Sequence, residues 1–212
     1  NWWPAKIAET AMFLVDHQAN KELANAVGRP PEQLPIKITA HIVHGNALQL
    51  DWADILPASA SKTYIFGNPP FIGQYTKTAE QTADMKQVWG KDYDGYLDYV
   101  TGWHAKAKDL LADRPGEFAY VTTNSITQGQ PVPALFGPLF REGWRIKFAH
   151  RTFKWDSEAP GKAAVHCVVV GFTRDSEAKP RLWDYPDVKG EPIEQSVGQG
   201  INGYLVDGPN VL

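Results

Sequence analysis

Five consecutive residues, Gly67-Asn68-Pro69-Pro70-Phe71, place two hydrogen-bond acceptors beside an aromatic ring. The side-chain carbonyl of Asn68 is the first acceptor. Pro69 offers the second, a main-chain carbonyl in a stiff backbone, because its own φ is fixed and the following Pro70 holds it extended. Phe71 adds a flat apolar face. Together these groups suit a flat ring that carries an amine with two hydrogens to donate.

The exocyclic amine of a nucleobase is such a group, and it is a weak nucleophile because its lone pair is delocalised into the ring. Two acceptors aimed at its hydrogens would pull the nitrogen toward a tetrahedral geometry and free the lone pair. Phe71 would stack on a base taken out of the double helix. Methyl transfer from a sulfonium donor needs no metal or strong base here, since the product nitrogen is cationic and readily sheds its proton. The simpler interpretation of the same string is a proline-stiffened turn.

An apolar run, Thr63–Phe66, precedes the motif and predicts a buried strand that stops at Gly67. Ligands of α/β sheets bind at the carboxyl ends of strands, which favours the functional interpretation. Strands and helices alternate elsewhere, so the sequence predicts an α/β fold with a parallel or mixed sheet. The other predicted strands are Ile36–Val43, Phe118–Thr123, Trp144–Ala149 and Ala163–Thr173, and the predicted helices are Pro4–Val27, Gly95–Ala112 and 131–142.

The composition fits one soluble domain, or two at most, in a chain of 212 residues with 43% hydrophobic positions. Its apolar runs are too short to cross a membrane. The single cysteine, Cys167, excludes a disulfide framework and favours a reducing, cytoplasmic setting. The net charge of −3 is poor for a protein that binds nucleic acid alone, because phosphate contacts need a surplus of Lys and Arg. His41 and His44 would lie on opposite faces of a strand, and no metal site is predicted.

The motif at 67–71, coming after an apolar strand, resembles motif IV of the amino-methylating DNA methyltransferases, which use S-adenosylmethionine and have a Rossmann-like sheet. The resemblance implies that residues 68–71 form the catalytic segment. It also implies cofactor contacts at Asn46 and Ala47, which follow a predicted strand, and at Asn68. Asn46 stands where the family more usually has an aspartate.

Phe153 and Trp155, followed by Lys162 and a valine-rich strand, resemble motif VIII of the same enzymes, whose aromatic residue packs on the other face of the flipped base. The resemblance implies base stacking by Trp155 in addition to Phe71, with Phe153 as the substitute candidate. Lys162 is predicted either to face a DNA phosphate or to be a turn lysine that precedes a strand.

Most of the chain resembles the methyltransferase portion of the large single-chain restriction-modification enzymes of the MmeI type. The similarity rests on the motif and on Pro4–Gln18, Val43–Trp52 and Tyr185–Leu212. Such enzymes methylate adenine at N6 and use separate domains to cut DNA and to read its sequence. The resemblance therefore implies a fragment of an adenine-N6 DNA methyltransferase, with double-stranded DNA bound through other domains of a parent chain.

One departure from the family pattern concerns the methyl donor. The family's glycine-rich cofactor loop and its ribose-binding acidic residue precede the segment that matches Trp2–Gln18, and neither is among the 212 residues. We therefore expect residues 1–173 to be the C-terminal part of a catalytic domain, with an incomplete Rossmann-like class I sheet, flanking helices and a C-terminal antiparallel strand region. Residues 174–212 are expected to be a linker or the start of the next module. The strand at Tyr64–Phe66 would have unpaired edges, and we expect a neighbouring copy to cover them or the region to be poorly ordered.

Two alternatives stay open. An Asn-Pro-Pro-aromatic motif also serves the methylation of a cytosine amine or of a glutamine side-chain amide. A non-catalytic module that binds nucleic acid or protein on a methyltransferase-like scaffold would explain the missing cofactor loop, but not the presence of Asn68 and Phe71. The string Gly198–Gly203 matches the dinucleotide-binding fingerprint but lacks the flanking strand and helix, so we set it aside.

The missing cofactor loop leads to a prediction for the isolated chain. Calorimetric titration of the 212-residue chain with S-adenosylmethionine should detect weak binding or none. Micromolar affinity would show that the remaining residues suffice to hold the methyl donor.

Overall fold

The structure is a computed structural model that describes residues 2–28, 41–59, 61–155, 165–187 and 190–210. Contacts divide the chain into two compact units, Asn1–Leu50 and Asp51–Leu212, each of which is described by itself.

The N-terminal unit contains one long helix, α1 (Trp2–Val27), which confirms the helix predicted from Pro4 onward. The helix ends at Gly28, whose φ of +69° is a conformation that glycine adopts without a steric cost. The strand predicted over Ile36–Val43 lies outside the described residues as far as position 40, and residues 41–43 are not in a strand.

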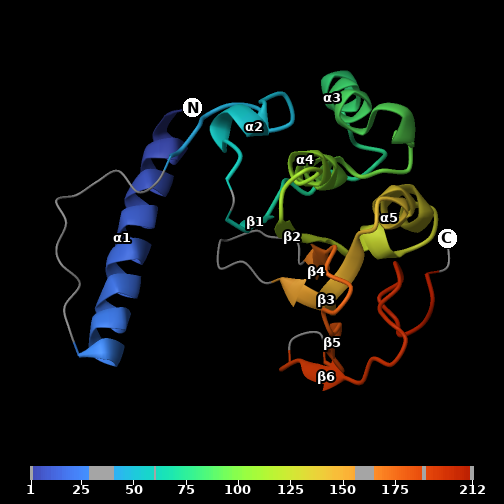
Figure 1. Ribbon diagram of the computed structural model, residues 1–212. Helices are drawn as coiled ribbons and strands as arrows, with labels where there is room; N and C mark the ends of the chain where they lie inside the picture. The colour runs from blue at the N-terminus through green and yellow to red at the C-terminus, as the bar shows by residue number, and fades with distance from the viewer. Residues whose placement is uncertain (1, 29–40, 60, 156–164, 188–189, 211–212) are drawn as a thin grey trace. The chain divides into compact units, whose positions relative to one another are not determined.

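The second unit is built on one mixed sheet, with six strands in the described residues in the order β1-β2-β4-β3-β5-β6 (Figure 1). β1 is parallel to β2 and β3 is parallel to β5, whereas β4 is antiparallel to both of its neighbours and β6 is antiparallel to β5. The predicted α/β class, with antiparallel strands toward the C-terminus, is confirmed. The strands are β1 (Thr63–Gly67), β2 (Gly116–Thr123), β3 (Arg145–Trp155), β4 (Val165–Thr173), β5 (Arg181–Asp184) and β6 (Ile193–Gln195).

β1 is an edge strand. It pairs with β2 on one side, and no other strand among the described residues borders it. Tyr64 and Phe66 point away from the core on the same face and are 62% and 82% exposed, so the predicted burial of this strand is wrong. The edge predicted at this strand is therefore present on one side, and its coverage by a neighbouring copy stays a prediction.

The helices of the second unit lie on one side of the sheet, with α4 and α5 above the central strands (Figure 1). Their bounds are α2 (Trp52–Ile55), α3 (Ala79–Trp89), α4 (Gly102–Leu110) and α5 (Pro131–Arg141), and the short 3-10 turns are η1 (Gly90–Asp92), η2 (Tyr99–Thr101) and η3 (Asn124–Thr127).

The helices agree with the predictions only in part. α5 confirms the helix predicted over 131–142. The helix predicted from Gly95 is wrong over its first residues, because Asp98 has an extended backbone (ψ 150°) and α4 begins only at Gly102. α3 was not predicted, although a capping box in which Thr78 and Gln81 bind each other's backbone N–H marks its start.

Aromatic side chains fill the core between the sheet and these helices. Phe118 of β2 stacks on Phe172 of β4 with ring centroids 4.7 Å apart. His104 of α4 meets both rings edge-on, and Phe136 of α5 lies 6.0 Å from Phe172. Complete burial lowers the pKa of His104 to about 3, so that the imidazole is neutral and packs as one more flat ring.

The segment after Thr173 stays with the sheet. β5 and β6 extend it beyond the boundary predicted at residues 173/174. Arg151 of β3 also donates from Nε to the carbonyl of Leu205 (2.8 Å), which ties the C-terminal residues to the sheet. In the described residues this segment is thus packed on the sheet rather than extended away from it, and its assignment to a separate module stays a prediction.

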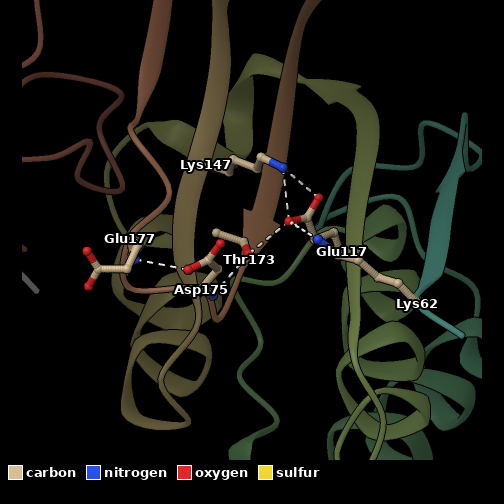
Figure 2. Close-up of polar contacts among 6 residues, drawn as sticks. All are labelled: Lys62, Glu117, Lys147, Thr173, Asp175 and Glu177. Atoms are coloured by element: carbon tan, nitrogen blue, oxygen red, sulfur yellow. Dashed lines mark hydrogen bonds and ion pairs between the residues drawn. The ribbon is translucent and has the colours of Figure 1, made fainter. Parts of the chain in front are cut away.

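A buried carboxylate joins four chain segments at the amino end of β2. Glu117 accepts hydrogen bonds from Lys147 of β3 (2.8 and 2.9 Å), from Thr173 of β4 (3.1 Å) and from Lys62 just before β1 (2.9 Å), as Figure 2 shows. Burial by itself would raise the pKa of Glu117, but the hydrogen bonds from Lys147, Lys62 and Thr173 outweigh it and lower the pKa. The charged form of Glu117 therefore stabilises the fold.

Replacing this carboxylate should destabilise the protein. Glu117→Gln leaves Lys147 without its ion pair, and we expect a loss of about 2–3 kcal/mol in the free energy of unfolding at neutral pH. Because folding lowers the pKa of Glu117, its stabilisation is present at neutral pH and is lost as the pH falls through the folded-state pKa. Urea denaturation over a pH series should therefore show a smaller acid-induced loss for the variant than for the wild type.

Glu194→Gln provides the control, because Glu194 makes an ion pair of 2.8 Å with Arg181 on the exposed surface. Exposed pairs contribute little to stability. Equal losses for the two variants would contradict the role assigned to Glu117.

Candidate functional site

The predicted motif leaves the sheet at the carboxyl end of β1. Gly67, the last residue of the strand, is in register with Tyr120 of β2, and the chain then turns out of the sheet. Asn68 is exposed, whereas the next residue, Pro69, is buried. A buried proline with a fixed φ anchors the backbone directly after Asn68. The arrangement presents the Asn68 amide to solvent from a rigid support.

The residues after the prolines fold into tight turns. The carbonyl of Pro70 accepts a hydrogen bond from the N–H of Ile72 (3.1 Å), and half-buried Phe71 lies between them in the chain. Thr76 then donates to the carbonyl of Gly73 from both its N–H and its hydroxyl, each at 3.0 Å. Residues 70–76 are therefore held by local hydrogen bonds. We call residues 68–77 the motif loop.

A buried carboxylate contacts the motif loop from a distant part of the chain. Asp98 is only 3% exposed. Its Oδ1 accepts the N–H of Gln74 (2.6 Å), and its Oδ2 accepts the hydroxyl of Ser125 (2.5 Å), which follows β2. The Ser125 hydroxyl is also 2.7 Å from that of Thr123. No local sequence pattern marks Asp98, and the sequence analysis missed it.

Two further hydrogen bonds join the neighbours of Asp98 to the motif loop and its surroundings. The N–H of Tyr99 donates to the carbonyl of Ile72 (2.9 Å), and Nζ of Lys77 donates to the carbonyl of Leu97. Burial lowers the pKa of Lys77, and attraction to the Asp98 carboxylate opposes that shift. Lys77 is thus the cation that faces Asp98 from the motif loop.

The predicted cofactor residues Asn46 and Ala47 belong to the N-terminal unit. The side-chain oxygen of Asn46 accepts the N–H of Leu48 (3.1 Å), and its carbonyl accepts the N–H groups of Gln49 (2.9 Å) and Leu50 (3.1 Å). These bonds form a compact turn. The contact of Asn46 and Ala47 with the cofactor stays a prediction.

Two of the three predicted stacking residues, Phe153 and Trp155, lie together on β3, whereas Phe71 belongs to the motif loop. The rings of Phe153 and Trp155 have centroids 6.2 Å apart, and Trp155 is 43% exposed. The pairing of β3 with β4 shifts between His150 and Phe153, as in a β-bulge, which re-aims the side chains that follow. Lys162 lies outside the described residues.

The sequence analysis did not predict a group of aromatic rings that lies next to Phe153. Tyr185 lies 5.3 Å from Phe153 between ring centroids, and its hydroxyl is 2.9 Å from Nδ1 of His150. His150 in turn stacks on Trp183 of β5, with centroids 4.5 Å apart and planes within 7°. Burial lowers the pKa of His150 and favours the neutral ring in this stack. The pairing of β3 with β5 creates the group, which local periodicity cannot reveal.

The glycine-rich string at 198–203 already has a ligand within the chain. The carboxylate of Asp207 accepts the N–H groups of Gly198 (3.0 Å), Gln199 (2.8 Å) and Gly200 (3.2 Å). These three hydrogen bonds lower the pKa of Asp207. The backbone donors that a phosphate would need are therefore used by an aspartate.

No group of three or more His, Cys, Asp or Glu side chains in the described residues is arranged to hold a metal ion. None of the described helices combines the length and the apolar character that a membrane crossing requires.

Residues 1–184 match the protein family described as MmeI, DNA-methyltransferase domain. The chain belongs to this family. Membership confirms the resemblance seen in the motifs. DNA methyltransferase A of Bacillus subtilis (strain 168) is 34% identical over 211 residues, which cover 97% of this chain and 23% of that relative.

The fold of the MmeI methyltransferase domain also agrees with the structure described above. The Type IIL restriction-modification enzyme MmeI, solved in complex with DNA, is 41% identical and superposes with a TM-score of 0.87. The match covers 100% of this chain and 28% of the solved one. The chain thus spans less than a third of the length of either relative.

Proposed function

We propose that this chain is the catalytic and base-binding part of an adenine-N6 DNA methyltransferase in a restriction-modification system. The observation that carries the proposal is the placement of Asn68 and Pro69 at the carboxyl end of β1, with the amide exposed and the proline buried. Family membership over residues 1–184 supports it. The alternative of a non-catalytic module does not account for an exposed asparagine on so constrained a backbone.

The proposed roles follow from the chemistry of the amine. The Asn68 side-chain oxygen and the Pro69 carbonyl accept the two hydrogens of the adenine N6 amine and draw its nitrogen toward a tetrahedral geometry. Acceptors fixed in advance stabilise the developing charge without reorganising. Phe71 holds the flipped base from one face, and Trp155 or Phe153 holds it from the other.

S-adenosylmethionine, when bound to the parent protein, supplies the methyl group. The carboxyl edge of a sheet that contains parallel strands is where such ligands bind, and the exposed Asn68 amide fits this location. We propose that Asn46, Ala47 and Asn68 contact it. The glycine-rich loop that the family uses for the same cofactor is not among the 212 residues, so these contacts are expected to supplement others.

Double-stranded DNA is the proposed macromolecular partner, bound largely by other domains of the parent chain. The net charge of −3 supports this division, since nonspecific DNA affinity comes from neutralising phosphates. Lys162 is the proposed phosphate contact within this chain.

Asn68→Ala tests the proposal in the full-length parent. The variant loses one of two transition-state acceptors, so we expect kcat to fall by roughly two or more orders of magnitude. A methylation assay on plasmid DNA, followed by mapping of the modified base, measures both rate and product. Near-wild-type activity would remove Asn68 from the mechanism. Modified cytosine in place of N6-methyladenine would show that the substrate is the other exocyclic amine.

Trp155→Ala and Phe153→Ala distinguish the two candidates for the outer face of the base. Base–aromatic stacking contributes about 1–3 kcal/mol per base, so loss of the stacking ring should lower kcat/KM by roughly 5-fold to 150-fold. Trp155→Ala is expected to show the larger effect, because its ring is more exposed than that of Phe153. The reverse order would assign the stacking to Phe153, and no effect from either variant would exclude this strand from base binding.

A further inference from the structure

We propose that Asp98 is the positioning residue of the motif loop: its carboxylate joins the backbone of that loop to the end of β2 and so fixes the direction of the Asn68 amide. The proposal rests on the function proposed above, because it concerns the accuracy with which Asn68 meets the amine. It assigns a role to a residue that contacts no reacting atom.

Hydrogen bonds connect the motif loop to the short segment that contains Asp98. The segment 97–99 makes contacts with three separate points of the chain after the prolines: Asp98 with Gln74, Tyr99 with Ile72, and Leu97 with Lys77. The hydrogen bond between Tyr99 and Ile72 joins two main-chain groups, and the one between Gln74 and Asp98 uses the main-chain N–H of Gln74. Main-chain groups cannot rotate away as a side chain can. They therefore restrain the path of the backbone between Phe71 and Lys77.

On its other side, the Asp98 carboxylate contacts the segment that follows β2. Oδ2 of Asp98 accepts the Ser125 hydroxyl, and Ser125 follows Thr123, the last residue of β2. β1 and β2 are parallel, so their carboxyl ends meet at the same edge of the sheet. Asp98 thereby connects the segment leaving β1 to the segment leaving β2 directly at this edge.

The burial of the Asp98 carboxylate has an energetic cost. A carboxylate that is 3% exposed loses most of its hydration, and each of its oxygens must be compensated. Glu117, a buried acid on β2, has two lysine partners and a hydroxyl. The hydrogen bonds to Asp98 come from neutral donors, one of which is the backbone of the motif loop, and Lys77, the cation that faces Asp98, belongs to the same loop. If that loop moved, Asp98 would lose a partner it cannot replace, so the cost of burial opposes the movement.

The experiment compares four variants of the full-length parent. Asp98→Ala removes both connections. Asp98→Asn keeps an oxygen for the Gln74 N–H and a polar group beside Ser125. Ser125→Ala removes only the connection to β2. Glu117→Gln is the matched control, a buried and hydrogen-bonded acid at the opposite end of β2.

Positioning predicts a particular pattern of rates. A displacement of about 1 Å at a reacting group can cost about 100-fold in rate, so kcat of Asp98→Ala should fall by roughly 30-fold to 100-fold while KM for DNA changes by less than about 3-fold. Asp98→Asn should recover most of the rate, and Ser125→Ala should lie between it and Asp98→Ala. Glu117→Gln should lose stability but keep kcat.

Hydrogen–deuterium exchange gives a readout that does not depend on methylation. Asp98→Ala should speed exchange across residues 72–77, and Glu117→Gln should not. If Asn68→Ala leaves activity intact, the proposed function fails while this exchange result still reports on the loop. Two outcomes would overturn the inference. One is unchanged kcat and exchange in both Asp98→Ala and Ser125→Ala. The other is Asp98→Asn as slow as Asp98→Ala, since the negative charge rather than the connection would then matter.

Discussion

The parallel pairing of β1 with β2 is the constraint on which the rest of the site depends. Five residue pairs, from Thr63 with Gly116 to Gly67 with Tyr120, fix the two strands in one register. Both strands therefore end at the same edge, where the motif loop begins on one and Ser125 follows the other. The contacts of Asp98 and the exposure of the Asn68 amide both presuppose this pairing.

The sequence predicted most of the fold because its signals are local. The apolar run before Gly67, the proline-containing stretch that forms α5 and the valine-rich β4 each show their structure within about ten residues. The motif was recognisable for the same reason, since Asn68 to Phe71 are consecutive. α3 carried a readable capping signal at Thr78 that was overlooked.

What could not be predicted arises from contacts between residues far apart in the chain. Asp98 meets Gln74 and Ser125, which are 24 and 27 positions away, and no periodicity reports such pairs. The ring group around Phe153 depends on a register shift in β3 and on pairing with β5. The helix predicted from Gly95 was wrong over its first residues for the same reason. The apolar spacing there is helical, but Asp98 has an extended backbone because its carboxylate binds the motif loop.

Glu117 and Asp98 together give β2 a property that neither gives alone. Sliding this strand by one residue would turn Glu117 to the opposite face, and sliding it by two would carry Glu117 past Lys147 and Thr173. The same movement would pull Ser125 away from Asp98 at the other end. Misregistered pairings of β2 thus cost buried carboxylates hydrogen bonds at both ends of the strand, so they are less stable than the native register. The position of Asn68 at the end of β1 therefore depends on β2, the strand with which β1 pairs, and on the single stable register of β2 in the sheet.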